Sequence, residues 1–301
     1  MVKRTDLQTS RDAVAAQPRM FWRGGIAGLA VSTLLFAAAP ARANEAEKHE
    51  ERPRQYEWSF AGVFGRYDKA QLQRGFKIYR EVCSSCHSIK LLAFRNLSEP
   101  GGPELPVDAV QQLAASYKVK DGPNAAGDYF ERPARPNDYF PPPFANEQAA
   151  RAALGGGYPP DMSVLAKGRG YSRGFPTFLL DGLPGFSYQE GGVDYIASLL
   201  QGYRDTPAGQ QLADGQYYNV YIPGRRIGMI PPLADGAVKY DDGAPQTVEQ
   251  YAKDVSAFLM WSAEPHLDQR KSVGLGVISF LIVFAALLFF VKRRVWSSVD
   301  H

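Results

Sequence analysis

The sequence predicts a mainly helical fold with long loops, followed by one membrane-spanning helix near the C-terminus. Apolar residues recur at steps of three and four in a few separated segments, which is the period of an amphipathic helix. Glycine- and proline-rich stretches fill most of the chain between these segments. One uncharged apolar run of nineteen residues, 273–291, is long enough to cross a bilayer. We therefore expect one domain without an extensive sheet, and one anchor.

The first 43 residues have the three parts of a secretory signal peptide. A basic stretch precedes an apolar run at 24–39, and Ala41-Arg42-Ala43 supplies the small-residue cleavage pattern. An uncleaved anchor helix is the alternative, but the sixteen residues of this run fall short of the ~20 that a span needs. We therefore expect cleavage after Ala43 and export of the chain that follows.

The charges beside the second apolar run predict its orientation. A basic triplet at 292–294 follows the run directly, and the positive-inside rule puts it in the cytoplasm. Arg270 and Lys271 at the other end weaken this asymmetry, and a buried core helix is the alternative reading of the run. The predicted parts are a signal peptide at 1–43, a periplasmic domain at 44–270, a transmembrane anchor at 271–294 and a cytoplasmic tail at 295–301.

The predicted domain has one long helix near its start and another near its end. The first covers 68–86, and the second covers 247–263, where Thr247 and Gln250 form a possible capping box and Pro265 follows the end. Shorter helices are predicted at 146–154 and 192–202. The apolar positions of the two long helices are Leu72, Phe76, Tyr79, Val82 and Cys86 in the first, and Val248, Tyr251, Val255, Phe258 and Leu259 in the second.

Long loops lie between these helices. They contain three consecutive prolines at 141–143, three glycines at 155–157 and seven glycines within 168–192. Such stretches resist regular structure and usually run over a surface.

The only two cysteines of the 301-residue chain lie in Cys83-Ser84-Ser85-Cys86-His87, the spacing that attaches a c-type haem. Two thiols three residues apart reach the two vinyl groups on one edge of the porphyrin, and the next histidine then lies beneath the iron. We predict one covalently bound haem c per chain, attached at Cys83 and Cys86, with His87 as an axial ligand of the iron.

Two other readings of these cysteines make different predictions. A structural zinc site needs four Cys or His ligands, but His49, His266 and His301 lie near a processed end, at a membrane boundary and at the last residue. A thiol oxidoreductase needs the cysteine pair at a helix start after a strand, which the flanking sequence does not offer. Export favours haem, because attachment to this motif normally follows export.

The second axial ligand has two candidates in loops. Met260 lies in the middle of the second long helix and is expected to pack in the core. Met229 lies between Gly228 and two prolines, so the backbone can approach the macrocycle and leave in a fixed direction. Met162 follows Pro159-Pro160-Asp161 and has similar loop chemistry. Spacing favours Met229 but leaves both open, and a thioether ligand raises the reduction potential.

The mature domain is expected to be acidic. The signal peptide holds six basic and two acidic residues, so its removal changes the formal net charge from +3 to about −1. Leaving out residues 271–301 as well brings the domain to about −4. Such a domain suits a basic soluble partner, since long-range attraction speeds encounter at low salt, although a solubilising charge is the plain alternative. We expect no nucleic-acid partner.

Several strings around the haem motif resemble, in this order, the cytochrome c1 family of bacterial cytochrome bc1 complexes. The resemblance runs from about residue 57 to residue 296, nearly all of the mature chain. Beside the motif itself, the strings lie at 74–79, 138–141, 146–151, 159–161, 199–203, 217–219, 223–232 and 263–266.

The resemblance implies a class I cytochrome c-like haem domain and assigns roles to residues. The family's axial methionine lies in an Ile-Gly-Met-x-Pro-Pro string, which implies Met229 as the second iron ligand and leaves Met162 as packing. Arg132 corresponds to an arginine that pairs with a haem propionate; a solvated loop arginine is the alternative, and Arg95 is a weaker candidate. No cysteine remains for the extra disulfide that some bacterial relatives have, and the segment 168–192 is longer than in mitochondrial relatives.

The resemblance also implies a function. The chain would accept one electron from the Rieske iron–sulfur protein and pass it to a soluble or membrane-anchored cytochrome c, beside cytochrome b in a dimeric quinol–cytochrome c reductase complex. It would be an electron carrier and not an enzyme on its own, held by a single span in the bacterial inner membrane with its haem domain in the periplasm. An anchored cytochrome c that serves another enzyme and a haem-free thiol oxidoreductase are the alternatives. Two acidic clusters could steer the acceptor: Glu45, Glu47, Glu50 and Glu51, or Glu99, Glu104 and Asp108.

Overall fold

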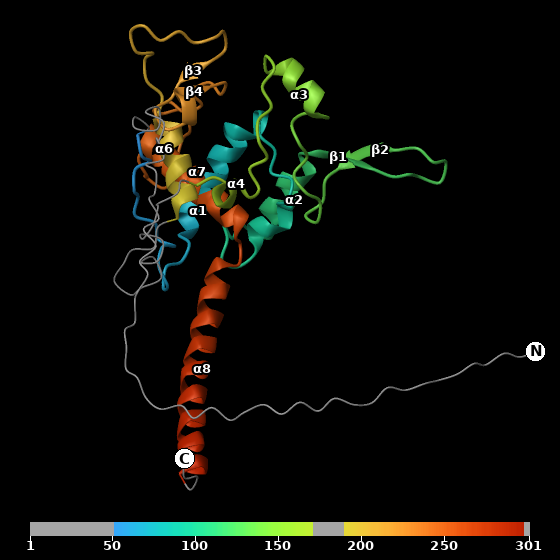
Figure 1. Ribbon diagram of the computed structural model, residues 1–301. Coiled ribbons are helices and arrows are strands. Elements are labelled where there is room, and N and C mark those ends of the chain that lie inside the picture. The colour runs from blue at the N-terminus through green and yellow to red at the C-terminus, as the bar shows by residue number, and fades with distance from the viewer. Residues whose placement is uncertain (1–50, 171–189, 298–301) are drawn as a thin grey trace, which may run out of the picture. The chain divides into compact units, whose positions relative to one another are not determined.

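The computed structural model describes residues 51–170 and 190–297. The predicted signal peptide, most of the glycine-rich segment at 168–192 and the last residues of the tail lie outside the described residues. The described part is mostly helical, with two small two-stranded sheets and one long apolar helix at its C-terminal end (Figure 1). This confirms the predicted fold class.

Helix α1, Lys69–Glu81, leads into the predicted haem motif. Asp68 caps its start by accepting a hydrogen bond from a first-turn amide at 2.9 Å. The α-helix ends before the predicted boundary at residue 86, and a short 3-10 helix, η2, Cys83–Ser85, follows it. The hydroxyls of Ser84 and Ser85 donate to backbone carbonyls at 2.7 and 3.0 Å, and this competition with helical bonding accounts for the tighter turn.

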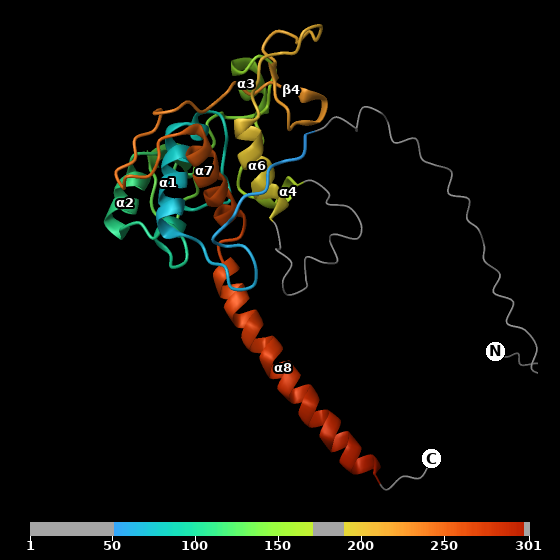
Figure 2. The same cartoon turned by 90° about the vertical axis from the view of Figure 1, so that its left-hand side faces the viewer.

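Helix α7, Val248–Ala263, packs closely on α1, and the two lie side by side in both views (Figures 1 and 2). Gly75 lies against the backbone of α7, because a β-carbon at this position would stand 2.1 Å from the carbonyl oxygen of Asp254. The ring of Phe258 packs on those of Phe76 and Tyr79, with centroids 5.6 and 5.9 Å apart. The glycine therefore sets how near the helices approach, and the aromatic rings fill the remaining space.

The start of α7 forms only half of the predicted capping box. The Thr247 hydroxyl accepts from the Gln250 amide at 3.3 Å, but the Gln250 side chain donates to Asp254 at 2.8 Å instead of reaching back. Burial extends around most of the helix and not along one face, because α1 and two further helices pack on it. Met260 is fully buried, which confirms its predicted packing role.

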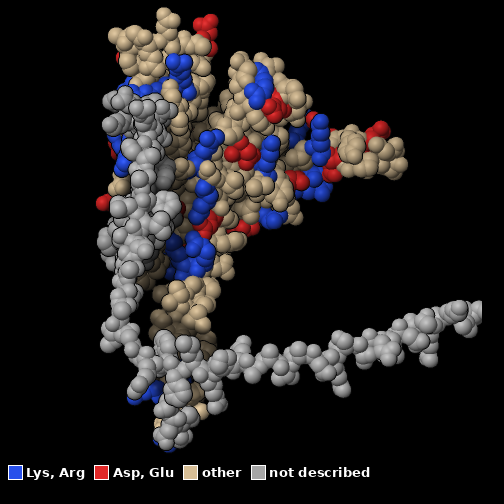
Figure 3. All heavy atoms as spheres, in the orientation of Figure 1, with Lys and Arg blue, Asp and Glu red and all other residues tan. Residues whose placement is uncertain are grey.

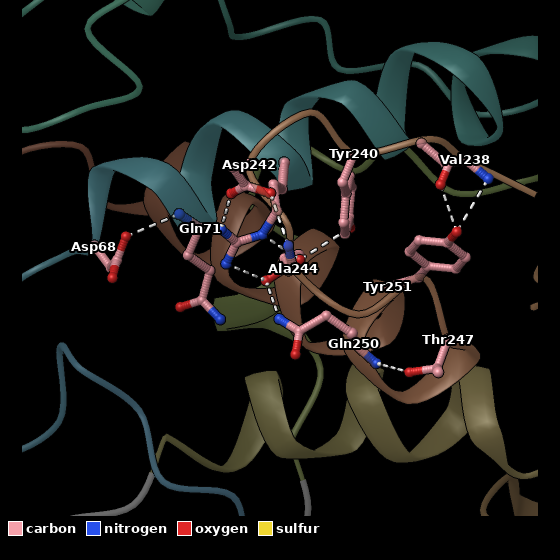
Figure 4. Close-up of polar contacts among 11 residues, drawn as sticks. Asp68, Gln71, Val238, Tyr240, Asp242, Ala244, Thr247, Gln250 and Tyr251 are labelled. Atoms are coloured by element: carbon pink, nitrogen blue, oxygen red, sulfur yellow. Dashed lines mark hydrogen bonds and ion pairs between the residues drawn. The ribbon is translucent and has the colours of Figure 1, made fainter. Parts of the chain in front are cut away.

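An ion-pair network joins α1 to α7 and to the loop before α7 (Figure 4). Arg74 donates to Asp254 at 2.8 and 3.2 Å and to Asp242 at 2.6 Å. Asp254 is fully buried and also accepts from the Tyr240 hydroxyl and the Gln250 side chain at 2.9 and 2.8 Å. The Arg74 guanidinium beside Asp242 helps to hold the pKa of that carboxyl below its ordinary value. Both Asp254 oxygens thus have donors, as a buried charge requires.

Shorter helices pack around this pair. Helix α6, Gly191–Gln201, and helix α4, Leu165–Gly168, contact α7. Helix α3, Glu147–Ala153, and α6 agree with their predicted boundaries within one residue. The sequence did not predict helix α2, Val107–Ala115. Two further 3-10 helices are η3, Phe94–Ser98, and η4, Pro223–Arg225.

The strands form two short antiparallel pairs within the described residues. Strand β1, Lys118–Asp121, pairs with β2, Phe130–Pro133, and β3, Tyr217–Tyr218, pairs with β4, Arg226–Ile227. These pairs agree with the expectation that no extensive sheet forms.

Helix α8, Leu267–Trp296, is the predicted anchor. Of the helices in the described part of the chain, it alone is long and apolar enough to cross a membrane. Its thirty residues cover about 45 Å at a rise of ~1.5 Å each. Apart from Leu267, which is buried, its large apolar side chains are exposed. An apolar helix with an exposed surface fits a single-pass membrane protein.

Candidate haem site

The turn after α1 holds both cysteines with free thiols. Cys83 is buried and Cys86 is half-buried, and neither forms a disulfide. The carbonyl of Cys83 accepts from the amides of Cys86 and His87 at 3.1 and 2.9 Å, so one turn contains all three residues of the motif. Burial, with the Cys86 thiol beside it, raises the pKa of Cys83 to about 12. A thiol that stays protonated is a poor nucleophile for disulfide exchange, which argues against the oxidoreductase reading.

His87 is buried, and one of its ring nitrogens is hydrogen-bonded. Its Nδ1 lies 2.9 Å from the carbonyl oxygen of Pro160, and since a carbonyl only accepts, Nδ1 carries the hydrogen. Burial lowers the pKa of His87, although the Pro160 carbonyl and Asp161 oppose this shift. With the hydrogen on Nδ1, the neutral ring has its lone pair on Nε2. This is the arrangement in which protein imidazoles bind metal ions.

A second segment fixes the Pro160 carbonyl against the imidazole. Asp161 accepts from the Ser88 hydroxyl at 2.7 Å, from the Lys90 amide at 3.0 Å and from the Ser163 amide at 2.9 Å. Although burial favours the neutral form, these hydrogen bonds hold the pKa of Asp161 below its ordinary value. These contacts of Asp161 were not predicted from the sequence. The available signal was an aspartate two residues before a serine, as in an Asx turn.

Met162 lies in the same segment and points into the core. Its side chain is buried in the hydrophobic cluster, and its amide donates to the Ser88 carbonyl at 2.8 Å. Met162 therefore helps to join the 160–163 segment to the chain after His87.

Met229 follows β4 in a loop held from two sides. The β3–β4 pair fixes the residues before it, with Tyr217 opposite Ile227. The Tyr203 hydroxyl donates to the Met229 carbonyl at 3.0 Å and lies 3.4 Å from the Ile230 carbonyl. The Met229 side chain is half-buried. Among the described residues, no hydrogen bond joins this loop to the Cys83–His87 turn.

Arg132 lies in β2 and is paired with two carboxylates. Its Nε donates to Asp121, and its two terminal nitrogens donate to Asp138 at 2.6 and 3.0 Å. The guanidinium holds the pKa of Asp138 below its ordinary value. Arg95 lies 3.7 Å from Glu99 and 3.4 Å from the Asn137 side chain. Both arginines thus have protein partners.

An aromatic cluster lies between these segments and α1. Phe140, two residues after Asp138, packs on Phe94 with ring centroids 4.1 Å apart and edge-on to Tyr79 at 6.4 Å. The Tyr79 hydroxyl donates to the His87 carbonyl at 3.2 Å. These buried rings make the surroundings of the motif apolar, which favours a less charged redox centre.

The donor set fits a c-type haem better than a bare metal ion. Two free cysteines, three residues apart and followed by a histidine with an available Nε2, are what covalent attachment and axial ligation need. Within 51–170 and 190–297, no group of three Cys, His, Asp or Glu side chains could hold a metal ion. Of the other histidines weighed for a zinc site, His49 and His301 lie outside the described residues.

Comparisons with known proteins agree with the sequence resemblance. The model of the Cytochrome C1 family matches residues 58–299. Cytochrome c1 of Blastochloris viridis is 49% identical over 277 residues, which are 91% of this chain and 96% of that protein. Cytochrome b/c1 of Bradyrhizobium diazoefficiens is 52% identical over 285 residues, 92% of this chain but only 41% of that longer protein.

The similarity extends to eukaryotes. The mitochondrial cytochrome c1 haem protein of Schizosaccharomyces pombe is 41% identical over 247 residues, 82% of this chain and 73% of that protein. The family match covers most of the chain, and the match to cytochrome c1 of Blastochloris viridis covers nearly the whole length of both proteins. The chain therefore belongs to the cytochrome c1 family, the haem subunits of cytochrome bc1 complexes.

Proposed function

We propose that this chain is a monohaem c-type electron carrier that takes one electron from a Rieske iron–sulfur protein and passes it to a soluble or membrane-anchored cytochrome c. The observation that supports it best is the fixed tautomer of His87, which leaves Nε2 available in the same turn as two free cysteines. On this proposal the chain makes and breaks no substrate bond, and it acts as one subunit of the quinol–cytochrome c reductase complex.

Four residues hold the haem in this proposal. Cys83 and Cys86 would carry the thioether bonds, and His87 and Met229 would bind the iron. When bound, the haem supplies a one-electron Fe(III)/Fe(II) couple. The Pro160 carbonyl orients the imidazole and raises its basicity, while Tyr203 holds the Met229 backbone. The aromatic cluster around Phe140 keeps water away from the motif and so favours the ferrous state.

Among the residue roles in this proposal, that of Arg132 as the partner of a haem propionate has the weakest support. Asp121 and Asp138 engage its Nε and both terminal nitrogens, so a propionate has to share or replace one of these carboxylates. Removing Asp121, the more exposed of the two, should then leave haem binding intact, because Asp138 keeps the arginine in place.

The proposed surroundings follow from the anchor and the family. Helix α8 spans the bacterial inner membrane once beside cytochrome b in a dimeric complex, with the haem domain on the periplasmic side after removal of the signal peptide. Of the two acidic clusters, Glu99 and Glu104 are paired with Arg95 and Lys69 at 3.7 and 3.1 Å, which reduces their attraction for a basic acceptor.

The first test combines a pyridine haemochrome spectrum after acid–acetone extraction, which reports covalent haem, with a visible spectrum of the native ferric protein, which reports the methionine-to-iron band. Met229→Leu is measured alongside in both. We expect haem c to stay bound in both proteins and the methionine-to-iron absorption band to disappear only in the variant. Loss of all haem from protein matured in a competent host would refute the proposal. Copurification with cytochrome b and the Rieske protein distinguishes it from an anchored cytochrome c that serves another enzyme.

A further inference from the structure

The loop before α1 exposes two large apolar side chains next to each other. Phe64 is 80% exposed and Val63 is 64% exposed. They lie at the tip of the loop at 60–65, whose sequence is Phe-Ala-Gly-Val-Phe-Gly. Single exposed apolar residues are ordinary on protein surfaces, so the position of this pair decides what it means.

Hydrogen bonds hold this loop to the first turns of α8. The ammonium group of Lys271 donates to the Phe60 carbonyl at 2.5 Å and to the Gly65 carbonyl at 3.3 Å. The amide of Tyr67 donates to Asp268 at 3.3 Å. In agreement with these contacts, the chain before α1 passes beside the first turn of α8 in Figure 2. Lys271 precedes the apolar run by two residues, about 3 Å along the helix axis, so both ends of the tip lie where the span begins.

The loop is well ordered at its base. Phe60 is fully buried and packs on Trp58 and Tyr67, with ring centroids 5.4 and 5.1 Å apart. Gly62 has a φ of +68°, and a β-carbon at Gly65 would stand 2.0 Å from the Ala61 carbonyl oxygen. The two glycines therefore allow a tight turn whose base is packed in the core while its tip stays outside.

Basic side chains accompany the apolar tip. Arg66 is exposed directly after the loop, and Lys and Arg side chains gather where α8 begins (Figure 3). Apolar side chains flanked by basic ones are typical of segments at the boundary between lipid headgroups and acyl chains, where the cations meet phosphates.

We propose that the tip of this loop, Val63 and Phe64, inserts into the membrane interface beside α8, on the side where the haem domain lies. A single helix leaves a domain free to tilt about its attachment point. A second contact next to the helix fixes the tilt and the height of the domain, and with them the distance of a redox centre from the membrane. The inference depends on the span of α8 and not on the haem chemistry.

Spin-label accessibility tests the insertion in the full-length haem-bearing protein, placed in nanodiscs of zwitterionic and anionic phospholipid. The label is attached at Phe64→Cys or Val63→Cys. Val277→Cys, inside the span, is the reference for a site buried in the bilayer. Tyr129→Cys is the matched control for a site in water, because Tyr129 is 74% exposed just before β2. All four sites are exposed in the protein, so folding is not at risk. Relaxation by oxygen is compared with relaxation by a water-soluble nickel chelate.

We expect the oxygen-to-nickel ratio at residues 63 and 64 to be several-fold above that at residue 129 and below that at residue 277. Equal ratios at residues 64 and 129 would overturn the insertion. So would shielding of residue 64 from both reagents in the complex with cytochrome b, because a protein would then cover the tip. Label uptake by the unmodified chain reports free Cys83 and Cys86, so a failure of the haem proposal is recognised separately from a failure of the insertion.

Discussion

The network around Arg74 makes a quantitative prediction about the stability of the haem domain. Asp254 is fully buried, the Arg74 side chain is 17% exposed and that of Asp242 is 42% exposed. Arg74→Met removes the guanidinium and leaves the Asp254 carboxylate buried with two neutral donors, from Tyr240 and Gln250. Breaking a buried pair in this way costs about 3–5 kcal/mol.

This loss of unfolding free energy corresponds to a large fall in the melting temperature. A change of 1 kcal/mol shifts the melting temperature of a domain of about 150–250 residues by roughly 2–4 °C. We therefore expect Arg74→Met to melt about 6–20 °C below the parent protein, by far-UV circular dichroism of the detergent-solubilised haem protein. Asp242→Asn is the matched control, because it removes only the exposed partner of the same arginine and should cost about 1 kcal/mol or less.

A double variant separates charge burial from packing. Arg74→Met combined with Asp254→Leu removes both charges, so no carboxylate stays buried without its cation, and the melting temperature should recover by at least half of the loss. If Asp242→Asn melts as low as Arg74→Met, or if the double variant loses the sum of the single losses, the reasoning is wrong.

Three further predictions concern the haem site and its supports. Gly75→Ala places a methyl group against the Asp254 carbonyl, where the separation would be 2.1 Å, and should lower stability by about 1–3 kcal/mol or more as the helices move apart, measured by thermal unfolding with Ala252→Gly as a cavity-forming comparison. Tyr203→Phe removes the hydroxyl that donates to the Met229 carbonyl. We expect haem to stay attached while the methionine-to-iron band weakens and the reduction potential falls. Tyr56→Phe, the control, should leave both the band and the potential unchanged. The pKa of Asp161 is depressed in the folded protein, so the stabilising contribution of this carboxylate is present above its unfolded pKa and is lost as pH falls through its folded pKa. The melting temperatures of the parent and Asp161→Asn should therefore differ at neutral pH and converge in acid. A difference that stays constant with pH would contradict the hydrogen-bond account.

Local patterns predicted most helices, because their signals are contained in a few consecutive residues. The period of apolar residues placed α1 and α7 within a few residues of their observed starts, and for α7 the cap residue Thr247 added to this signal. The end of α1 was wrong, since hydroxyls of Ser84 and Ser85 compete for helical carbonyls, and helical period alone carries no information about that competition. Helix α2 was missed although Val107, Val110 and Ala114 recur at steps of three and four, the period of an amphipathic helix.

The candidate site also combines features that local sequence predicts with features that it does not. The haem-attachment motif is five consecutive residues, and the span of α8 is an uninterrupted apolar run. The sequence alone therefore predicted the cofactor class, the helical fold and the anchor. The tertiary structure decided which distant groups support them: Pro160 beside His87, Tyr203 beside Met229, and Arg74 beside Asp254. These pairs are separated by many residues along the chain, and only the packing of α1, α6 and α7 brings such groups within hydrogen-bonding distance.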